Sequence, residues 1–257
     1  MSQIHIHGEL DGGIANLRIS NPGKYNALPQ SGWLDVKPAV DDLVSAGARV
    51  VIVSGESGNF CAGADISEFD IVRRDAETAR VYEASNVEAF DAVRECRVPT
   101  IAQIEGYCLG GGFGLAAACD LRLATLEARF AVPAARLGLG YPVDAMADIV
   151  EAVGAQNAKR LLFAAERFSS AEMMSMGFLL NVVDDVNALN AEVTALADKI
   201  AQLAPLTHQA TKATVRALRS GDFVAAKQAS DATFSSADYA EGRAAFREKR
   251  QPLFGGQ

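Results

Sequence analysis

The stretch GYCLGGGFGLAAACDLRLA, residues 106–124, holds three consecutive glycines, Gly110 to Gly112, ahead of a run of small apolar residues that predicts a helix. A glycine inside a helix costs about 1 kcal/mol relative to alanine, so a bare backbone at this place needs a reason. The segment before it, VPTIAQIEG (98–106), is apolar and ends in glycine, which is typical of a buried strand. The stretch therefore predicts a strand, a glycine turn and a helix.

A second junction of this kind lies earlier in the chain. ARVVIVSG (48–55) predicts a buried strand, and NFCAGADISEF (59–69) follows it. Glycine lets backbone amides approach a ligand because no Cβ is in the way, and the start of a helix offers unpaired N–H groups. One amide from each junction would converge on one oxygen and form an oxyanion hole. The alternative is that the glycines only permit tight packing of strand against helix.

The remaining patterns indicate an α/β core followed by helices. Residues 3–9 and 14–20 alternate as two paired strands, and residues 30–46 carry a helical pattern. Strands and helices then alternate, and from about residue 192 the chain is alanine-rich and helical. We therefore expect an α/β core over residues 1–195 and a C-terminal helical oligomerisation region over residues 196–257.

Composition narrows the class of protein. The 257 residues are 49% hydrophobic and 22% charged, with a net charge of −8, so neither nucleic acid nor membrane is expected as a partner. GGGFGL lacks the acidic residue about twenty positions on that a dinucleotide site requires, and there is no P-loop lysine. The three histidines show no metal-binding spacing, so we expect no metal. With no apolar signal segment and no C-x-x-C pair, a cytoplasmic location and reduced cysteines are expected.

Four segments in order carry a resemblance to a known family: NPGKYNAL (21–28), FCAGADI (60–66), the stretch 106–124 and EGRAAFREKRQPLF (241–254). Together they resemble the crotonase, or enoyl-CoA hydratase/isomerase, superfamily. The resemblance implies a spiral of ββα units with a C-terminal helical trimerisation region, assembled as a homotrimer or homohexamer. It also implies an acyl-CoA thioester as substrate, with CoA as part of that substrate and no separate cofactor.

The resemblance also assigns roles to residues. The amides of Ala64 and Gly111 would form the oxyanion hole for the thioester, and the carbonyl of Ala62 would meet the adenine amino group. Lys24 would contact the CoA nucleotide. The remaining residues implied to surround the substrate are the motif neighbours Asp65, Ile66 and Gly110, and Phe246 and Lys249 on a C-terminal helix that closes over this pocket or a neighbour's. Asp65 is alternatively expected to cap the local backbone.

The sequence departs from the family pattern where proton transfer is expected. Hydratases of the family carry glutamates at the positions of Gly114 and Ala134. Neither residue can activate water or deliver a proton, so the sequence supports enolate stabilisation better than hydration. Phe113 is expected to fill the space that the first glutamate would use, and all three residues are expected to line the substrate pocket.

Two titratable residues follow in RLGLGYPVDAM (136–146). Tyr141 is expected either to line the pocket or to pack structurally. Asp144 is either a pocket acid or a cap or first-turn acid of the next helix. The resemblance implies enoyl-CoA hydration or isomerisation as the nominal reaction. Decarboxylation of a malonyl-type CoA thioester and a non-catalytic acyl-CoA-binding subunit are the alternatives.

Overall fold

A six-stranded sheet, mostly parallel, forms the centre of the computed structural model, which describes residues 5–257. The first two strands are antiparallel and every later neighbour is parallel. In spatial order the strands are β1 (His5–Asp11), β2 (Ile14–Ser20), β3 (Val50–Gly55), β4 (Thr100–Ile104), β6 (Leu121–Thr125) and β9 (Asn181–Val183). The predicted α/β class is confirmed, although residues 3 and 4 of the first predicted strand lie outside the described part of the chain.

A smaller three-stranded sheet includes β5, the strand that leads through the glycine turn into α4. Its order is β5 (Tyr107–Leu109), β7 (Arg129–Ala131) and β8 (Phe168–Ser169). The helices are α1 (Gln30–Ser45), α2 (Phe69–Val72), α3 (Ala76–Arg94), α4 (Gly111–Ala118), α5 (Val143–Ala164), α6 (Ser170–Ser175), α7 (Val186–Ala201), α8 (Pro205–Ser220), α9 (Val224–Phe234) and α10 (Ala237–Glu248), with short 3-10 turns at η1 (Ile66–Glu68) and η2 (Pro133–Leu137).

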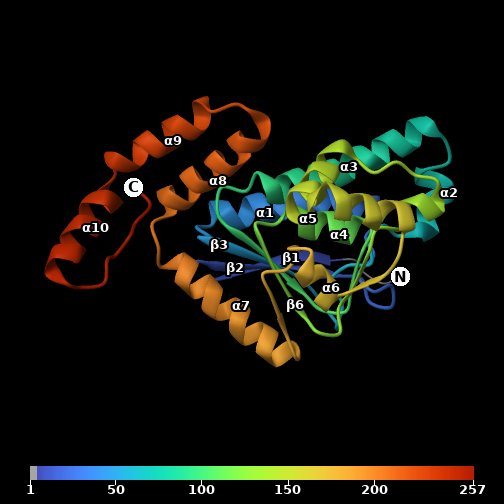
Figure 1. Ribbon diagram of the computed structural model, residues 1–257, viewed down its shortest axis with the longest axis horizontal. Helices are drawn as coiled ribbons and strands as arrows, with labels where there is room; N and C mark the ends of the chain where they lie inside the picture. Colours follow the sequence, from blue (N-terminus) through green and yellow to red (C-terminus); the bar gives the residue numbers. More distant parts are fainter. Residues whose placement is uncertain (1–4) are drawn as a thin grey trace.

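Helices cover both faces of the large sheet. In Figure 1, α1, α3, α4 and α5 lie on one side of the strands and α7 lies on the other. The side chains of β3 show why, because they are buried toward both faces: Val51 and Val53 join the larger core, whereas Val50 and Ile52 pack with α7. A continuous apolar run is the pattern expected of such a strand.

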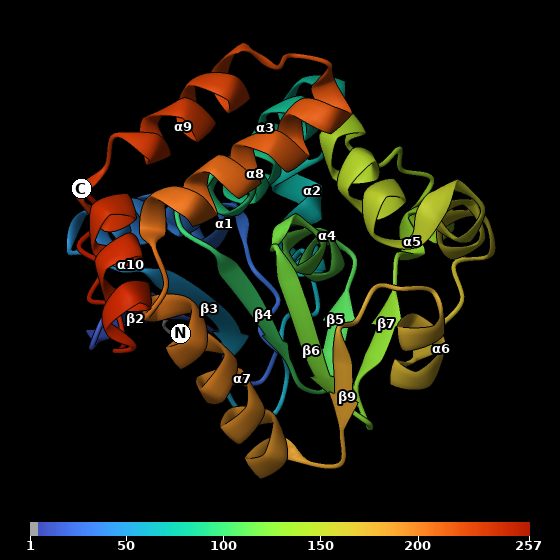
Figure 2. The same cartoon turned by 60° about the vertical axis from the view of Figure 1, so that its left-hand side comes forward.

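The boundary expected after residue 195 falls inside α7. This helix packs Leu189, Val193 and Ala197 against the sheet, so its whole length belongs to the core. The C-terminal helices α8, α9 and α10 come after it and form one end of the molecule (Figures 1 and 2). None of the helices in residues 5–257 is both long and apolar enough to cross a membrane.

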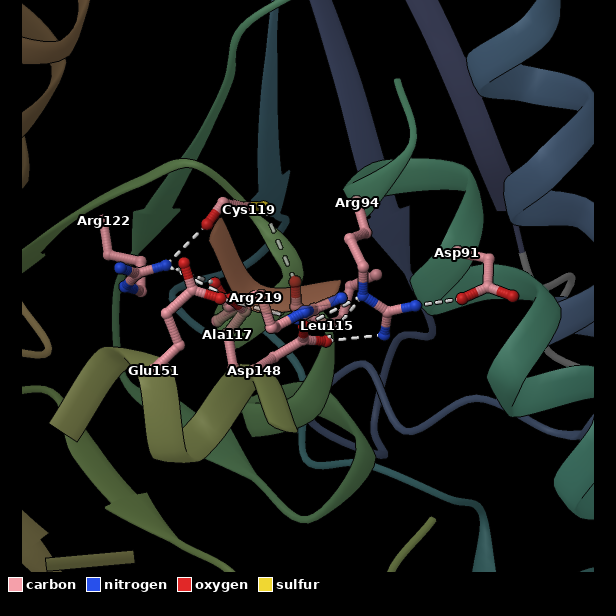
Figure 3. Close-up of polar contacts among 10 residues, drawn as sticks. Asp91, Arg94, Leu115, Ala117, Cys119, Arg122, Asp148, Glu151 and Arg219 are labelled. Carbon is pink, nitrogen blue, oxygen red and sulfur yellow. Dashed lines mark hydrogen bonds and ion pairs between the residues drawn. The ribbon is translucent and has the colours of Figure 1, made fainter. Parts of the chain in front are cut away.

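A buried cluster of charges joins α8 to the core. The carboxylate of Asp148, on α5, accepts hydrogen bonds from Arg94 of α3 and from Arg219 of α8, each at 2.6 Å (Figure 3). Beside it, Arg122 donates to the carbonyls of Ala117 and Cys119 at the end of α4. The bonds from Arg122 satisfy carbonyls at the end of α4, and the ion pairs of Asp148 join α3, α5 and α8.

Candidate active site

The two glycine junctions meet side by side in the fold. Cys61 pairs with Cys108 in a parallel bridge, which brings the turn after β3 against the turn after β5. Gly63 has a φ of +93°, and a Cβ there would lie 2.7 Å from the carbonyl oxygen of Leu109. A Cβ on Gly112 would lie 2.2 Å from the carbonyl oxygen of Cys61. These two glycines are therefore needed for close packing of the junctions.

A cavity of about 120 Å³ opens where the junctions meet, and Ala64 and Gly111 both line it. Gly111 is the first residue of α4, so its N–H has no carbonyl partner within the helix. The backbone groups on either side of Ala64 are engaged elsewhere: Leu28 donates to the carbonyl of Gly63, and the Asp65 amide donates to the carbonyl of Leu28. Among the hydrogen bonds of the described residues, neither the Ala64 nor the Gly111 amide has an acceptor. The arrangement offers two N–H donors to one cavity, as the oxyanion-hole interpretation requires.

Tyr141 takes the space in front of Gly114. A Cβ on Gly114 would lie 2.5 Å from the Tyr141 hydroxyl oxygen and 2.9 Å from the Phe90 ring. That hydroxyl donates to the carbonyl of Gly110 at 2.8 Å. Burial raises the pKa of Tyr141 above its ordinary value of 10.0, so the phenol is protonated at neutral pH. Tyr141 therefore lines the cavity as a neutral hydroxyl in the direction of the missing glutamate.

Phe113 lies elsewhere, contrary to the expectation that it fills this space. Its ring is fully buried and stacks on Phe178, with ring centroids 4.4 Å apart. Successive residues of a helix point in different directions, so Phe113 faces the core beneath the small sheet while Gly114 faces Tyr141. Of the three residues expected to line the pocket, Ala134 does line the cavity and offers only a methyl group, whereas Phe113 and Gly114 are not among the lining residues.

Asp144 lies in the first turn of α5 and is exposed, and it is not among the residues that line the cavity. Phe246 and Lys249 are also away from the cavity of their own chain. Phe246 is on α10 with 84% of its surface exposed, and Lys249 ends that helix. Within one chain the structure thus leaves these three predicted residues apart from the two amides.

Of the residues implied to hold CoA, Ala62, Asp65 and Ile66 lie at the junction after β3, and Gly110 lies at the junction after β5. Ala62, Ile66 and Gly110 line the cavity. Lys24 donates to the carboxylate of Asp65 at 2.6 Å, and Asp65 also accepts from the Ser67 amide and so caps η1. Burial would raise the pKa of Asp65, but the hydrogen bonds from Lys24 and Ser67 outweigh burial and lower it.

Three polar residues that the sequence analysis did not single out also line the cavity: Arg73, Glu83 and Asn86, here called the polar wall. Arg73 Nη2 pairs with Glu83 Oε1 at 2.6 Å. Its guanidinium carbon lies 4.7 Å and 4.2 Å from the ring centroids of Phe69 and Tyr82.

One signal of the polar wall was present in the sequence. Tyr82, Asn86 and Phe90 are four residues apart along α3, and all three are buried. Residues at this spacing share one face of a helix. The polar side chain of Asn86 on this otherwise apolar face was therefore the signal that a buried polar group is present.

Comparisons with known proteins identify the family of the chain. A family model described as enoyl-CoA hydratase/isomerase matches residues 9–257. The chain is 31% identical to a peroxisomal Delta(3,5)-Delta(2,4)-dienoyl-CoA isomerase of Arabidopsis thaliana, covering 97% of this chain and 95% of the relative. It is also 31% identical to a crotonyl-CoA hydratase of Syntrophomonas wolfei, covering 94% of each. A crystal structure of an enoyl-CoA hydratase/carnithine racemase from Magnetospirillum magneticum superposes with a TM-score of 0.91 at 35% identity, covering 98% of this chain and 96% of that one.

Proposed function

The chain belongs to the enoyl-CoA hydratase/isomerase family, and from this premise we propose that its cavity binds the thioester carbonyl of an acyl-CoA and stabilises the enolate formed from it. The observation that carries the proposal is the pair of unpartnered amides, Ala64 and Gly111, on one cavity. An enolate oxygen gains negative charge as the α-proton leaves, and fixed N–H donors stabilise that charge. Each such donor is typically worth about 2.7 to 4 kcal/mol in the transition state.

The size of the cavity supports a short acyl group. Its volume is about 120 Å³, somewhat less than the ~150 Å³ engineered cavity that holds one benzene molecule. The side chains around it that would contact an acyl chain are largely apolar, among them Phe69, Phe90 and Leu139. A chain of a few carbons beyond the thioester would fill this space.

Glu83 is the candidate for proton transfer. Among the described residues that line the cavity it is the single carboxylate. Its ion pair with Arg73 engages Oε1 and leaves Oε2 for the substrate. Double-bond isomerisation can proceed with one such group: the carboxylate takes a proton from C2 of a 3-enoyl thioester, and the dienolate takes the same proton back at C4. Hydration needs a group to activate water as well, and Gly114 and Ala134 supply none. We therefore propose isomerisation of a short enoyl-CoA.

The test compares Glu83→Gln with wild type on 3-butenoyl-CoA and crotonyl-CoA. We expect conversion of 3-butenoyl-CoA into crotonyl-CoA, with little hydration of the latter. Glu83→Gln should slow isomerisation about 10²- to 10⁴-fold, the usual contribution of a positioned acid or base. Glu88→Gln, exposed on the same helix, is the matched control and should retain full activity. Rapid crotonyl-CoA hydration that Glu83→Gln leaves unchanged would contradict the assignment.

Decarboxylation of a malonyl-type thioester is the second candidate. It is favoured by the absence of a carboxylate at Gly114 and Ala134, because loss of CO₂ yields the enolate directly and needs no base. Release of CO₂ from methylmalonyl-CoA at a rate that Glu83→Gln does not lower would select this reaction. Tight binding of CoA esters without turnover of any of them would instead select the non-catalytic subunit.

A further inference from the structure

Tyr82 is a fully buried residue of α3 that is not among the residues lining the cavity. Its hydroxyl accepts a hydrogen bond from Nε1 of Trp33 at 3.1 Å and donates one to the carbonyl of Leu28 at 3.4 Å. A hydroxyl group can make both bonds at once. Burial raises the pKa of Tyr82 above its ordinary value of 10.0, so the hydroxyl keeps the proton that it donates. The hydroxyl therefore joins α3 to two residues at the start of α1.

Leu28, the first of these residues, holds the peptide group that carries the Ala64 amide. Leu28 and Ala64 pair in a parallel bridge. In this bridge the Leu28 amide donates to the carbonyl of Gly63, and the Asp65 amide donates to the carbonyl of Leu28, both at 2.8 Å. The carbonyl of Gly63 and the N–H of Ala64 belong to one planar peptide group, so fixing the first fixes the direction of the second. A shift of Leu28 would therefore turn the Ala64 N–H.

Trp33, the second residue, packs against the backbone that carries the Gly111 amide. Cζ2 and Cη2 of its ring lie 2.9 Å and 3.0 Å from the place that a Cβ on Gly111 would occupy. The ring thus rests on the first residue of α4. Trp33 is fully buried, and the bond from its Nε1 to Tyr82 fixes the orientation of the ring. Without that acceptor the buried Nε1 donor would be unpaired, at a cost that favours a turn of the ring.

We propose that Tyr82 is a positioning residue, whose hydroxyl holds the two amides of the oxyanion hole in the geometry that an enolate oxygen requires. It acts on the Ala64 amide through Leu28 and on the Gly111 amide through Trp33. The inference rests on the proposed function, since that function puts the thioester oxygen between the two amides. It adds that the strength of the oxyanion hole depends on a hydroxyl that the substrate does not touch.

The ring of Tyr82 makes a separate contact, so the hydroxyl can be tested by itself. The guanidinium carbon of Arg73 lies 4.2 Å from the centroid of this ring, and Arg73 pairs with Glu83 at 2.6 Å. Phenylalanine has the same ring, so Tyr82→Phe keeps this contact and leaves the proposed proton-transfer group in place. A loss of activity in this variant therefore reports on the two hydrogen bonds of the hydroxyl.

The first experiment measures kcat and KM of Tyr82→Phe on 3-butenoyl-CoA. We expect kcat to fall about 10- to 100-fold, since misplacing a group by about 1 Å can cost 10²-fold in rate. KM should change less than about twofold, because the donors act mainly on charge that develops in the transition state. The dependence of kcat on pH should keep its wild-type form, because Glu83 is unaltered.

Ser85→Ala is the matched control. Ser85 is buried on the same helix, and its hydroxyl donates to the backbone carbonyl of Tyr82 at 2.6 Å. The variant therefore also loses a buried hydroxyl and one hydrogen bond, but that bond lies within the helix and does not lead to either amide. Its melting temperature should fall to a similar extent, whereas kcat should stay at the wild-type value.

The second experiment measures the oxyanion hole without turnover. Acetoacetyl-CoA loses a proton between its two carbonyl groups, and the ultraviolet absorbance of the resulting enolate gives the ionised fraction. Wild type should raise this fraction above that of the free ester at the same pH, because two N–H donors stabilise the enolate. Tyr82→Phe should lower the ratio of bound enolate to bound neutral ester about tenfold. Butyryl-CoA stays neutral and should bind within about twofold of its wild-type affinity.

Trp33→Phe tests the same hydrogen bond from its other end. It keeps an aromatic ring beside Gly111, should give the same losses, and replaces Tyr82→Phe if melting curves show that the latter does not fold. Wild-type kcat and a wild-type enolate ratio in either folded variant would overturn the inference. An equal loss of both in Ser85→Ala would overturn it too, because any loosening of α3 would then have this effect. Failure of wild type to raise the ionised fraction above that of the free ester would overturn the proposed function and the inference with it.

Discussion

Gly111 both begins α4 and lines the cavity with its backbone amide. A Cβ at this position would point at the buried ring of Trp33, 2.9 Å from Cζ2. Trp33 is fully buried and its Nε1 donates to the Tyr82 hydroxyl, so the ring cannot easily move away. Any side chain at Gly111 would therefore displace the start of α4 and with it the amide that faces the cavity.

We predict that Gly111→Ala lowers kcat by about 10²- to 10³-fold, the cost of losing one oxyanion donor. Steady-state kinetics on the 3-enoyl ester and circular dichroism would be measured on the same sample. Gly255→Ala is the control, because a Cβ there would meet open space. Full activity of Gly111→Ala would mean that the Gly111 amide does not contact the reacting carbonyl.

Tyr141 provides a second prediction at the scale of one side chain. Tyr141→Phe removes the hydrogen bond to Gly110, whose carbonyl still accepts from the Gly114 amide at 3.1 Å. The free energy of unfolding should therefore fall by only about 0.5 to 1.5 kcal/mol.

Its dependence on pH should change as well. Since burial raises the Tyr141 pKa above 10.0, the stability that this group contributes is present below pH 10.0 and is lost as pH rises beyond it. Tyr141→Phe should thus flatten the decline in stability above that pH, as followed by urea unfolding at several pH values. An unaltered alkaline decline would show that other groups cause it.

At the scale of elements, the start of α5 places Tyr141 and Asp144 differently, although the sequence analysis named both as candidates for the pocket. Pro142 is the N-cap residue and makes no side-chain capping bond. The stability of the first turn therefore depends more on the charged residue within it. Asp144 stands in that turn, where a negative charge interacts favourably with the helix dipole. Tyr141, the residue before this N-cap, lines the cavity instead.

We predict that Asp144→Asn lowers the free energy of unfolding by about 0.3 to 1 kcal/mol, through the helix dipole, and leaves turnover unchanged. Differential scanning calorimetry and kinetics on the same preparation separate the two effects. A large loss of turnover with an unchanged melting temperature would assign Asp144 to the chemistry, through a partner chain or a moved loop.

On the scale of the whole molecule, the C-terminal helices expose large apolar side chains. Val224, Phe234 and Phe246 are 65%, 65% and 84% exposed, and Leu253 beyond α10 is 84% exposed. Apolar surface gathered at one end of a chain marks an interaction site. In Figure 1 these helices lie at the end of the molecule remote from α2, so the surface is available to another copy.

We predict that the protein forms a trimer or a dimer of trimers through this end. Light scattering after gel filtration should give three or six times the chain mass of 27.1 kDa. Phe246→Asp should weaken the assembly, because it places a charge in an apolar contact, whereas Phe246→Leu should preserve it. A stable monomer at micromolar concentration would contradict the prediction.

The sequence alone was sufficient for the α/β architecture, the two strand–glycine–helix junctions and the family. Strand and helix periodicity and the conformations of glycine are local properties, and four motifs in order leave few alternatives for the fold. The candidate site could be predicted from the sequence only in part. The sequence pointed to the Ala64 and Gly111 amides, but it placed Phe113 where Tyr141 stands and gave no role to Arg73, Glu83 or Asn86.

The physical reason is that a cavity wall is made of contacts between residues far apart in the chain. Tyr141 reaches Gly110 across 31 positions, by way of a loop whose path depends on how α5 packs against α4. Phe113 and Gly114 are neighbours in sequence, yet the helix turns one toward Phe178 and the other toward the Tyr141 hydroxyl. Which side chain fills a space, and which buried polar group remains without a partner, follows from the packing of whole elements against one another.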